Sequence, residues 1–355
     1  MKLPVDLPAV LSAALDIERA SSIPVSVNIL IDETAAPDFQ VFVRAGFNSE
    51  SLNSRVMVSY FPTQPPDTAL SCDLTIIAAA KNESVGAIAS SFRNQGTPVL
   101  VVAENGEEVI ALAKQSGNPL PEDDVVFLQD AAFDEELKGE LADKIGRWIV
   151  AAVDADKKLA FSIAYPFVRR PLAYDAISTT SLQNAGIGVV VFVPGADMPL
   201  MTANQIKMIL QIAAAYGQPL GPERVVELLG VLVNAFIFRS ISRQLAGLVP
   251  ALGWAVKGTM GYLGTQAIGR AAIEYFEGGG SVAGLVALAG KATNETAKVV
   301  TFAQSQPTLR SVGEKVGPVA RKVATGALDA LGPVATSAGK TILSSMKPGA
   351  RKKKI

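Results

Sequence analysis

The sequence contains no histidine and a single cysteine. Without histidine it lacks the commonest general base, the usual partner of nucleophilic serine and cysteine, and the commonest transition-metal ligand. We therefore expect no catalytic residue, no metal and no cofactor. Cys72 has no second cysteine with which to form an intramolecular disulfide, and residues 1–8 do not have the pattern of a cleavable signal peptide. Both features favour the reducing cytoplasm.

Charged side chains are also scarce. They make up 18% of the 355 residues, whereas ordinary soluble domains have roughly 25%. Hydrophobic residues account for 49%, and the mean hydropathy is +0.31. A chain of this length is expected to form about two domains. The composition fits either an Ala/Val/Leu-rich globular protein or one that partly enters a membrane.

Charge is divided unequally along the chain. Residues 281–355 carry twelve lysines and arginines against three acidic residues, a net charge of +9, whereas the first 280 residues carry −10. The chain ends in a run of one arginine and three lysines at residues 351–354. A basic tail beside an acidic body favours an anionic partner such as lipid headgroups or nucleic acid, although it could serve only to keep the chain soluble.

Hydrophobic periodicity divides the chain into an N-terminal helix (residues 1–23), an α/β domain (24–155), an apolar helical domain (156–280) and a basic Ala/Gly-rich tail (281–355) that is helical or partly disordered. In the α/β domain, short apolar runs alternate with amphipathic stretches. The expected strands are Val25–Ile31, Arg55–Tyr60, Leu74–Ala80, Val99–Val102 and Val125–Leu128, and the expected helices are Ser84–Asn94, Glu107–Ser116 and Asp134–Val153. Strands that are apolar throughout are buried on both faces, so this pattern predicts a doubly wound parallel sheet.

The order of these elements resembles that of a small GTPase domain. In such a domain the first strand leads into a phosphate loop, in which glycines let backbone N–H groups converge on phosphate and a lysine neutralises its charge. Residues 32–39 instead read Asp-Glu-Thr-Ala-Ala-Pro-Asp-Phe. This segment has no glycine or lysine, and its three carboxylates would repel a phosphate. Phosphate binding is therefore not expected there.

The other nucleotide-binding positions of a GTPase are lost as well. Residues 61–64 read Phe-Pro-Thr-Gln where the magnesium-binding Asp-x-x-Gly would stand, and residues 103–106 read Ala-Glu-Asn-Gly where Asn-Lys-x-Asp would read guanine. The sequence therefore resembles a degenerate GTPase-like domain, a pseudo-GTPase without its chemistry. An unrelated Rossmann-like fold is the alternative.

The helical domain has more distinctive motifs. They are Pro-Gly-Ala-Asp-Met-Pro at 194–199, Thr-x-x-Gln at 202–205, Pro-x-x-Gly-Trp at 250–254 and Thr-x-x-Ile-Gly at 265–269. Over about residues 160–277 the chain resembles the bacterial family catalogued as domain of unknown function 697. The resemblance implies a helical domain beside a GTPase-like domain and proximity to the inner membrane, but no reaction.

This domain contains three apolar stretches, and a membrane span needs about 20 largely apolar residues. Residues 186–193 are too few, residues 225–238 contain Glu227 and Asn234, and residues 245–263 contain Pro250 and several glycines. No stretch is a clean span. The last could equally form a re-entrant or buried hairpin.

Several residues of the helical domain are candidates for structural roles. Asp197, in a Pro/Gly-rich turn, is expected to accept hydrogen bonds from backbone donors. Thr202 and Gln205 have the spacing of a capping box and predict a helix that begins there, runs to Tyr216 and ends at Gly217.

The candidate contacts to an outside partner are basic. Arg239 and Arg243 lie one helical turn apart and could bind lipid phosphates or the carboxylates of a protein partner, or simply face solvent. Lys352, Lys353 and Lys354 could add to attraction toward an anionic surface.

Together these features predict a non-catalytic, membrane-associated regulatory or scaffold protein at the cytoplasmic face of the membrane. Its protein partner could be a true GTPase, and its oligomeric state is open. One alternative is a nucleotide-binding GTPase-like enzyme with a non-standard phosphate site. Another is a cytoplasmic protein that binds nucleic acid through its tail, where a single aromatic residue, Phe302, gives little support for base stacking.

Overall fold

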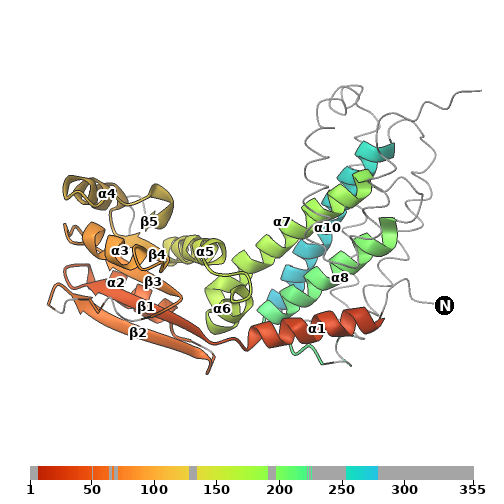
Figure 1. Cartoon of the computed structure of the whole chain (residues 1–355), viewed down its shortest axis with the longest axis horizontal. Coiled ribbons are helices and arrows are strands. Elements are labelled where there is room, and N and C mark those ends of the chain that lie inside the picture. Colours follow the sequence, from red (N-terminus) through yellow and green to blue (C-terminus); the bar gives the residue numbers. More distant parts are fainter. Residues whose placement is uncertain are drawn as a thin grey trace, which may run out of the picture. The chain divides into compact units, whose positions relative to one another are not determined.

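The computed structural model describes residues 7–49, 51–63, 66–67, 71–127, 134–190, 197–221, 223, 225 and 253–278 (Figure 1). These residues belong to two compact units. One comprises residues 14–175 and 211–220 and contains the β-sheet. The other draws its described residues from 7–13, 176–210, 221–225 and 253–278 and is helical.

The sheet unit is built on five parallel strands in the order β2-β1-β3-β4-β5. The strands are β1 (Val25–Asp32), β2 (Ser54–Phe61), β3 (Leu74–Ala79), β4 (Val99–Ala103) and β5 (Val125–Phe127). Each expected strand is confirmed to within a residue or so at its ends. In β3 and β4 every residue is buried, as expected for strands covered on both faces.

Helices cover both faces of this sheet. The first five helices along the chain are α1 (Leu7–Ser21), α2 (Pro37–Gly46), α3 (Val85–Arg93), α4 (Gly106–Gln115) and α5 (Glu135–Ala152), and a short 3-10 helix, η1, spans Glu122–Asp124. Phe39 and Val43 of α2 pack with Ile145 of α5 in one hydrophobic cluster. Phe92 of α3 and Val109 of α4 belong to the cluster on the other face. The doubly wound α/β architecture is therefore confirmed.

The helices begin where the local sequence supports it. Asp134 caps α5 by accepting a hydrogen bond from the backbone N–H of Leu137 at 2.9 Å, and Asn105 caps α4 by accepting from Glu108 at 3.2 Å. The helix α2 is not among the helices predicted from the sequence. Pro37 occupies the first turn of α2, where its fixed φ and missing N–H are tolerated.

The remaining helices are α6 (Lys158–Ala164), α7 (Pro166–Val190), α8 (Asp197–Ala215) and α10 (Gly253–Glu277). The compact unit that contains the sheet also includes α6 and the first part of α7, to Asp175. Of the remaining residues in the expected helical domain (156–280), the structure describes only a part. Among the described residues, no helix is both long and apolar enough to cross a membrane.

Candidate functional site

The candidate site lies at the carboxyl ends of β1 and β3. The strand β2 lies on one side of β1, and β3, β4 and β5 follow in that order on the other side, so the strand order reverses between β1 and β3. In open α/β sheets, ligands bind in the crevice at such a switch point. Residues 32–39, the position compared with a phosphate loop, begin at this point.

The side chain of Asp32 occupies the switch point itself. It is fully buried at the end of β1. Its Oδ1 accepts hydrogen bonds from the backbone N–H of Thr34 at 3.0 Å and from the Thr34 hydroxyl at 2.7 Å. Its Oδ2 accepts from the backbone N–H of Ala80, directly after β3, at 3.2 Å. The Asp32 carboxylate therefore accepts hydrogen bonds from backbone N–H groups that follow β1 and β3.

A second carboxylate lies at the N-terminus of α2. The backbone N–H of Ala36, the N-cap residue, donates to Oε1 of Glu104 at 2.7 Å. Glu104 follows β4, so residues distant in the sequence meet here. Helix N-termini attract anions because their first N–H groups are unpaired. At α2, Pro37 has no N–H and Ala36 donates to a side chain of the same protein.

The surroundings of these two carboxylates are acidic. Glu33 accepts a hydrogen bond from the Thr63 hydroxyl, and Asp38 lies in the first turn of α2. Lys81, which follows β3, pairs with Glu108 of α4 at 3.5 Å. An incoming phosphate would therefore meet negative charge at positions where nucleotide-binding loops offer N–H groups and a lysine. No group of acidic or cysteine side chains in the described residues has the arrangement of a metal site.

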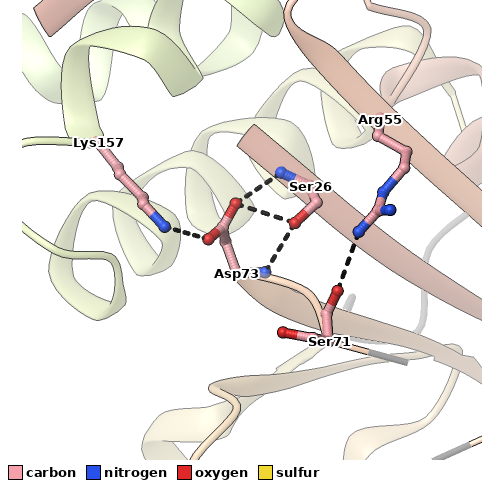
Figure 2. Close-up of polar contacts among 5 residues, drawn as sticks. All are labelled: Ser26, Arg55, Ser71, Asp73 and Lys157. Atoms are coloured by element: carbon pink, nitrogen blue, oxygen red, sulfur yellow. Dashed lines mark hydrogen bonds and ion pairs between the residues drawn. The ribbon is translucent and has the colours of Figure 1, made fainter. Parts of the chain in front are cut away.

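A second polar cluster lies at the opposite, amino-terminal edge of the sheet (Figure 2). Asp73, just before β3, accepts hydrogen bonds from the backbone N–H of Ser26 at 2.6 Å and from the Ser26 hydroxyl at 3.0 Å. Lys157, just before α6, forms an ion pair with the other oxygen of Asp73. The hydrogen bond from Lys157 to Asp73 raises the pKa of the lysine above its ordinary value. This cluster fastens the start of α6 to β1 and β3.

Arg55 lies beside the same cluster but makes a separate contact. Its guanidinium donates to the backbone carbonyl of Ser71 at 3.0 Å (Figure 2). Nearby, the hydroxyls of Tyr165 and Ser54 lie 2.7 Å apart. Burial raises the pKa of Tyr165 to about 12, with the hydrogen bond to Ser54 opposing the shift and the charge of Asp73 adding to it. We assign this edge a structural role.

The structure corrects one prediction about the helical unit. The helix α8 begins at Asp197, so Thr202 and Gln205 lie within the helix and do not form a capping box at its start. Both side chains are buried, and Gln205 donates to the hydroxyl of Thr265 in α10 at 2.9 Å. The predicted end is confirmed, because Gly217 has a φ of +74° and follows the last turn. Gln205 of the Thr-x-x-Gln motif therefore contributes to a contact between α8 and α10.

The other candidate residues fall in parts of the chain without a structural description. Arg239, Arg243, Lys352, Lys353 and Lys354 lie outside the described residues, as do most of residues 225–238 and the whole basic tail. The side chain of Asp197 is likewise not described. Their proposed contacts remain predictions.

Comparison with known proteins finds no matching family model, curated protein or solved structure. The resemblance to a small GTPase domain therefore rests on the order of the elements alone, and that to domain of unknown function 697 rests on the quoted motifs alone.

Proposed function

We propose that this chain is a non-catalytic, membrane-associated regulatory or scaffold protein whose α/β domain is a degenerate GTPase-like domain that recognises a protein partner. The observation that carries the non-catalytic part is the occupation of the switch point by the protein's own carboxylates. Asp32 and Glu104 accept hydrogen bonds from the backbone N–H groups of Thr34, Ala80 and Ala36, so these donors are already used within the chain.

The strand order is consistent with this proposal. The order 2-1-3-4-5 is a doubly wound arrangement shared by proteins of different activity, including flavodoxin-like proteins. Because a fold does not fix a function, the argument rests on the site. That site satisfies its own donors and is negatively charged, which suits a domain retained for binding another protein.

A nucleotide-binding measurement on the full chain tests the first half of the proposal. Labelled GTP and ATP, each with magnesium, are titrated against the purified protein and against an established GTPase as a positive control. We expect no saturable binding to this chain. Saturable binding would overturn the proposal and favour a GTPase-like enzyme with a non-standard phosphate site.

The membrane part of the proposal is supported by the sequence. The tail carries a net charge of +9, and each basic residue near an anionic leaflet adds about 1 kcal/mol of attraction. We propose that the tail and the apolar helical domain hold the protein at the cytoplasmic face of the membrane. There the α/β domain would meet its partner, for which a true GTPase is our first candidate.

Vesicle flotation of the full chain tests this half. We expect binding to vesicles that contain anionic lipid, weaker binding to neutral vesicles, and partial release by salt, which screens exposed charges. The variant Lys352→Gln/Lys353→Gln/Lys354→Gln should bind at least tenfold more weakly. The control variant Lys81→Gln/Lys114→Gln/Lys144→Gln changes the net charge equally in the sheet unit and should bind like wild type. Equal loss in both variants, or no flotation at all, would contradict a tail-directed membrane role.

A further inference from the structure

The helical unit contains a buried polar cluster made by three helices. Its members are Asn184 of α7, Gln205 of α8 and Thr265 of α10, whose exposed fractions are 0%, 2% and 0%. The Thr265 hydroxyl accepts hydrogen bonds from Asn184 Nδ2 at 2.9 Å and from Gln205 Nε2 at 2.9 Å. It donates its own hydrogen to the carbonyl of Gly261, one turn earlier in α10, at 2.7 Å. One hydroxyl thus joins all three helices and has its donor and both acceptor positions filled.

Asn184 extends the cluster toward α8. Its Nδ2 also points to the carbonyl of Met201 at 3.4 Å, and its Oδ1 accepts from Asn204 Nδ2 at 3.1 Å. Both groups of the Asn184 amide are therefore used. Buried polar groups that lose their partners cost free energy, whereas apolar contacts tolerate small displacements. In the observed alignment of the helices the Thr265 hydroxyl and the Asn184 amide are satisfied, whereas the buried Oε1 of Gln205 has no hydrogen-bond partner.

The contact between α7 and α10 depends on glycines. A Cβ at Gly261 would lie 2.6 Å from the carbonyl oxygen of Asn184, and a Cβ at Gly269 would lie 2.3 Å from Cγ1 of Ile177. Asn184 meets Gly261, and Ile177 meets Gly269, so the two helices run in opposite directions. Small residues allow this close approach, but glycine offers no side chain that would fix one position of α7 along α10.

We propose that the Thr265 hydroxyl selects a single register of α7, α8 and α10. Sliding one helix by a turn moves its groups by about 5.4 Å, which would separate the hydroxyl from the Asn184 and Gln205 amides. The best-attested role of isolated buried polar groups is to specify one register at some expense of stability. Thr265 meets the requirement because its hydrogen bonds are directional and are shared by three helices.

Distances between spin labels on the full chain test the proposal. In a Cys72→Ser background, labels are placed at Leu182→Cys in α7 and Glu274→Cys in α10, both at exposed positions. A second pair joins Leu182→Cys to Lys207→Cys, an exposed position of α8. Each pair should give one narrow distance distribution when the register is unique.

The decisive substitution is Thr265→Val, which keeps the shape of the side chain and removes the hydroxyl. We expect at least one label pair to gain a second population displaced by about one helical turn, ~5 Å. Thr265→Ser keeps the hydroxyl and should retain a single population. Thr202→Val makes the same atomic change in α8 but leaves all bonds of Thr265 in place, and it should also behave like wild type.

The result that overturns the proposal is an unchanged narrow distribution for both label pairs in Thr265→Val, even with a lower melting temperature. The hydroxyl would then add stability without choosing the register. If Thr265→Val does not fold, Gln205→Met decides the question, because it removes one of the two donors to the hydroxyl. A broadened α7–α8 distribution in Gln205→Met supports the proposal, and an unchanged one overturns it.

Discussion

Asp32 at the end of β1 and Ala80 directly after β3 are joined by a hydrogen bond of 3.2 Å, in which the backbone N–H of Ala80 donates to the Asp32 carboxylate. The bond spans the position at which the strand order of the sheet reverses. Proteins that bind ligands at this position leave strand-end and loop donors for them. Here the backbone N–H groups of Thr34, Ala80 and Ala36 donate to carboxylates of the same chain.

The substitution Asp32→Ala should strongly destabilise the sheet unit. It leaves the buried N–H of Ala80 without its acceptor, which costs about 1–3 kcal/mol, and it removes the turn contacts of Asp32 to the N–H and hydroxyl of the exposed Thr34. We expect a total loss of about 2–4 kcal/mol, measured by urea unfolding with Trp148 fluorescence in a Trp254→Phe background. Asp38→Ala, in the first turn of α2, is the control and should cost less than about 1 kcal/mol. A similar small effect of both variants would show that the Asp32 bonds contribute little.

Much of the sheet could be predicted from the sequence, because its strands are short apolar runs bounded by turn residues. Val99–Ala103, for example, is buried at every position and follows Pro98. The helix α2 is not predicted from the sequence, because its buried residues, Phe39 and Val43, are too few to give a clear helical periodicity. The sequence revealed the three carboxylates of residues 32–39 but not which residues contact this segment, because Glu104 and Ala80 reach it only through the strand order.

The polar cluster of the helical unit shows a similar limit. Gln205 and Thr265 lie in two of the motifs of the helical domain, Thr-x-x-Gln at 202–205 and Thr-x-x-Ile-Gly at 265–269. Their meeting with Asn184 depends on how three helices pack, which periodicity does not specify. The capping-box interpretation of Thr202 and Gln205 failed because the same spacing, i and i+3, also places two residues on one helix face.

The ion pair between Lys157 and Asp73 should stabilise the sheet unit at neutral pH and lose that contribution at alkaline pH. Lys157→Met leaves Asp73, whose side chain is 15% exposed, without its cation, and we expect a loss of about 1–2 kcal/mol. Because the hydrogen bond raises the pKa of Lys157, the stabilisation is fully present below the unfolded lysine pKa. It disappears as the pH rises through the folded pKa.

A double-mutant cycle measures this pair directly. Urea unfolding of wild type, Lys157→Met, Asp73→Asn and the double variant gives the coupling energy at neutral pH and again above the lysine pKa. The coupling should be favourable at neutral pH and shrink at alkaline pH. A coupling that is independent of pH would contradict the assignment. The surface pair Lys144–Glu140 is a suitable comparison and should show a smaller coupling.

Tyr165 should also weaken the folded state at alkaline pH. Its folded pKa of about 12 lies above the ordinary value of 10.0, chiefly because the ring hydroxyl is buried. The unfolded chain therefore loses this proton first, and the stability should fall by up to about 1.4 kcal/mol per pH unit between these two pKa values. In Tyr165→Phe the free energy of unfolding should no longer fall because of this phenol. The variant should also be less stable than wild type by an amount that does not depend on pH, because it lacks the contact with Ser54.

Ultraviolet titration of the tyrosines checks the same assignment. The difference between wild type and Tyr165→Phe should reveal one phenol that ionises near pH 12. Tyr174→Phe, at a position 42% exposed, is the control for removal of a phenol. A difference curve for Tyr165→Phe centred near pH 10 would show that the phenol is not protected as the structure indicates.

The substitution Gly261→Ala should loosen the helical unit, because the added methyl group meets main-chain atoms that cannot rotate away. The new Cβ would lie 2.6 Å from the carbonyl oxygen and 3.0 Å from the carbonyl carbon of Asn184. Relief requires α7 and α10 to move apart, which also stretches the bonds of Asn184 to Thr265. We expect a loss of about 1–3 kcal/mol, measured by hydrogen exchange of peptides from α7 and α10. The control is Gly139→Ala in α5, where the added Cβ would have no atom within 4 Å. This substitution should stabilise its helix by about 0.5–1 kcal/mol. If Gly261→Ala proved equally stabilising, the close approach of the two helices at Asn184 would be disproved.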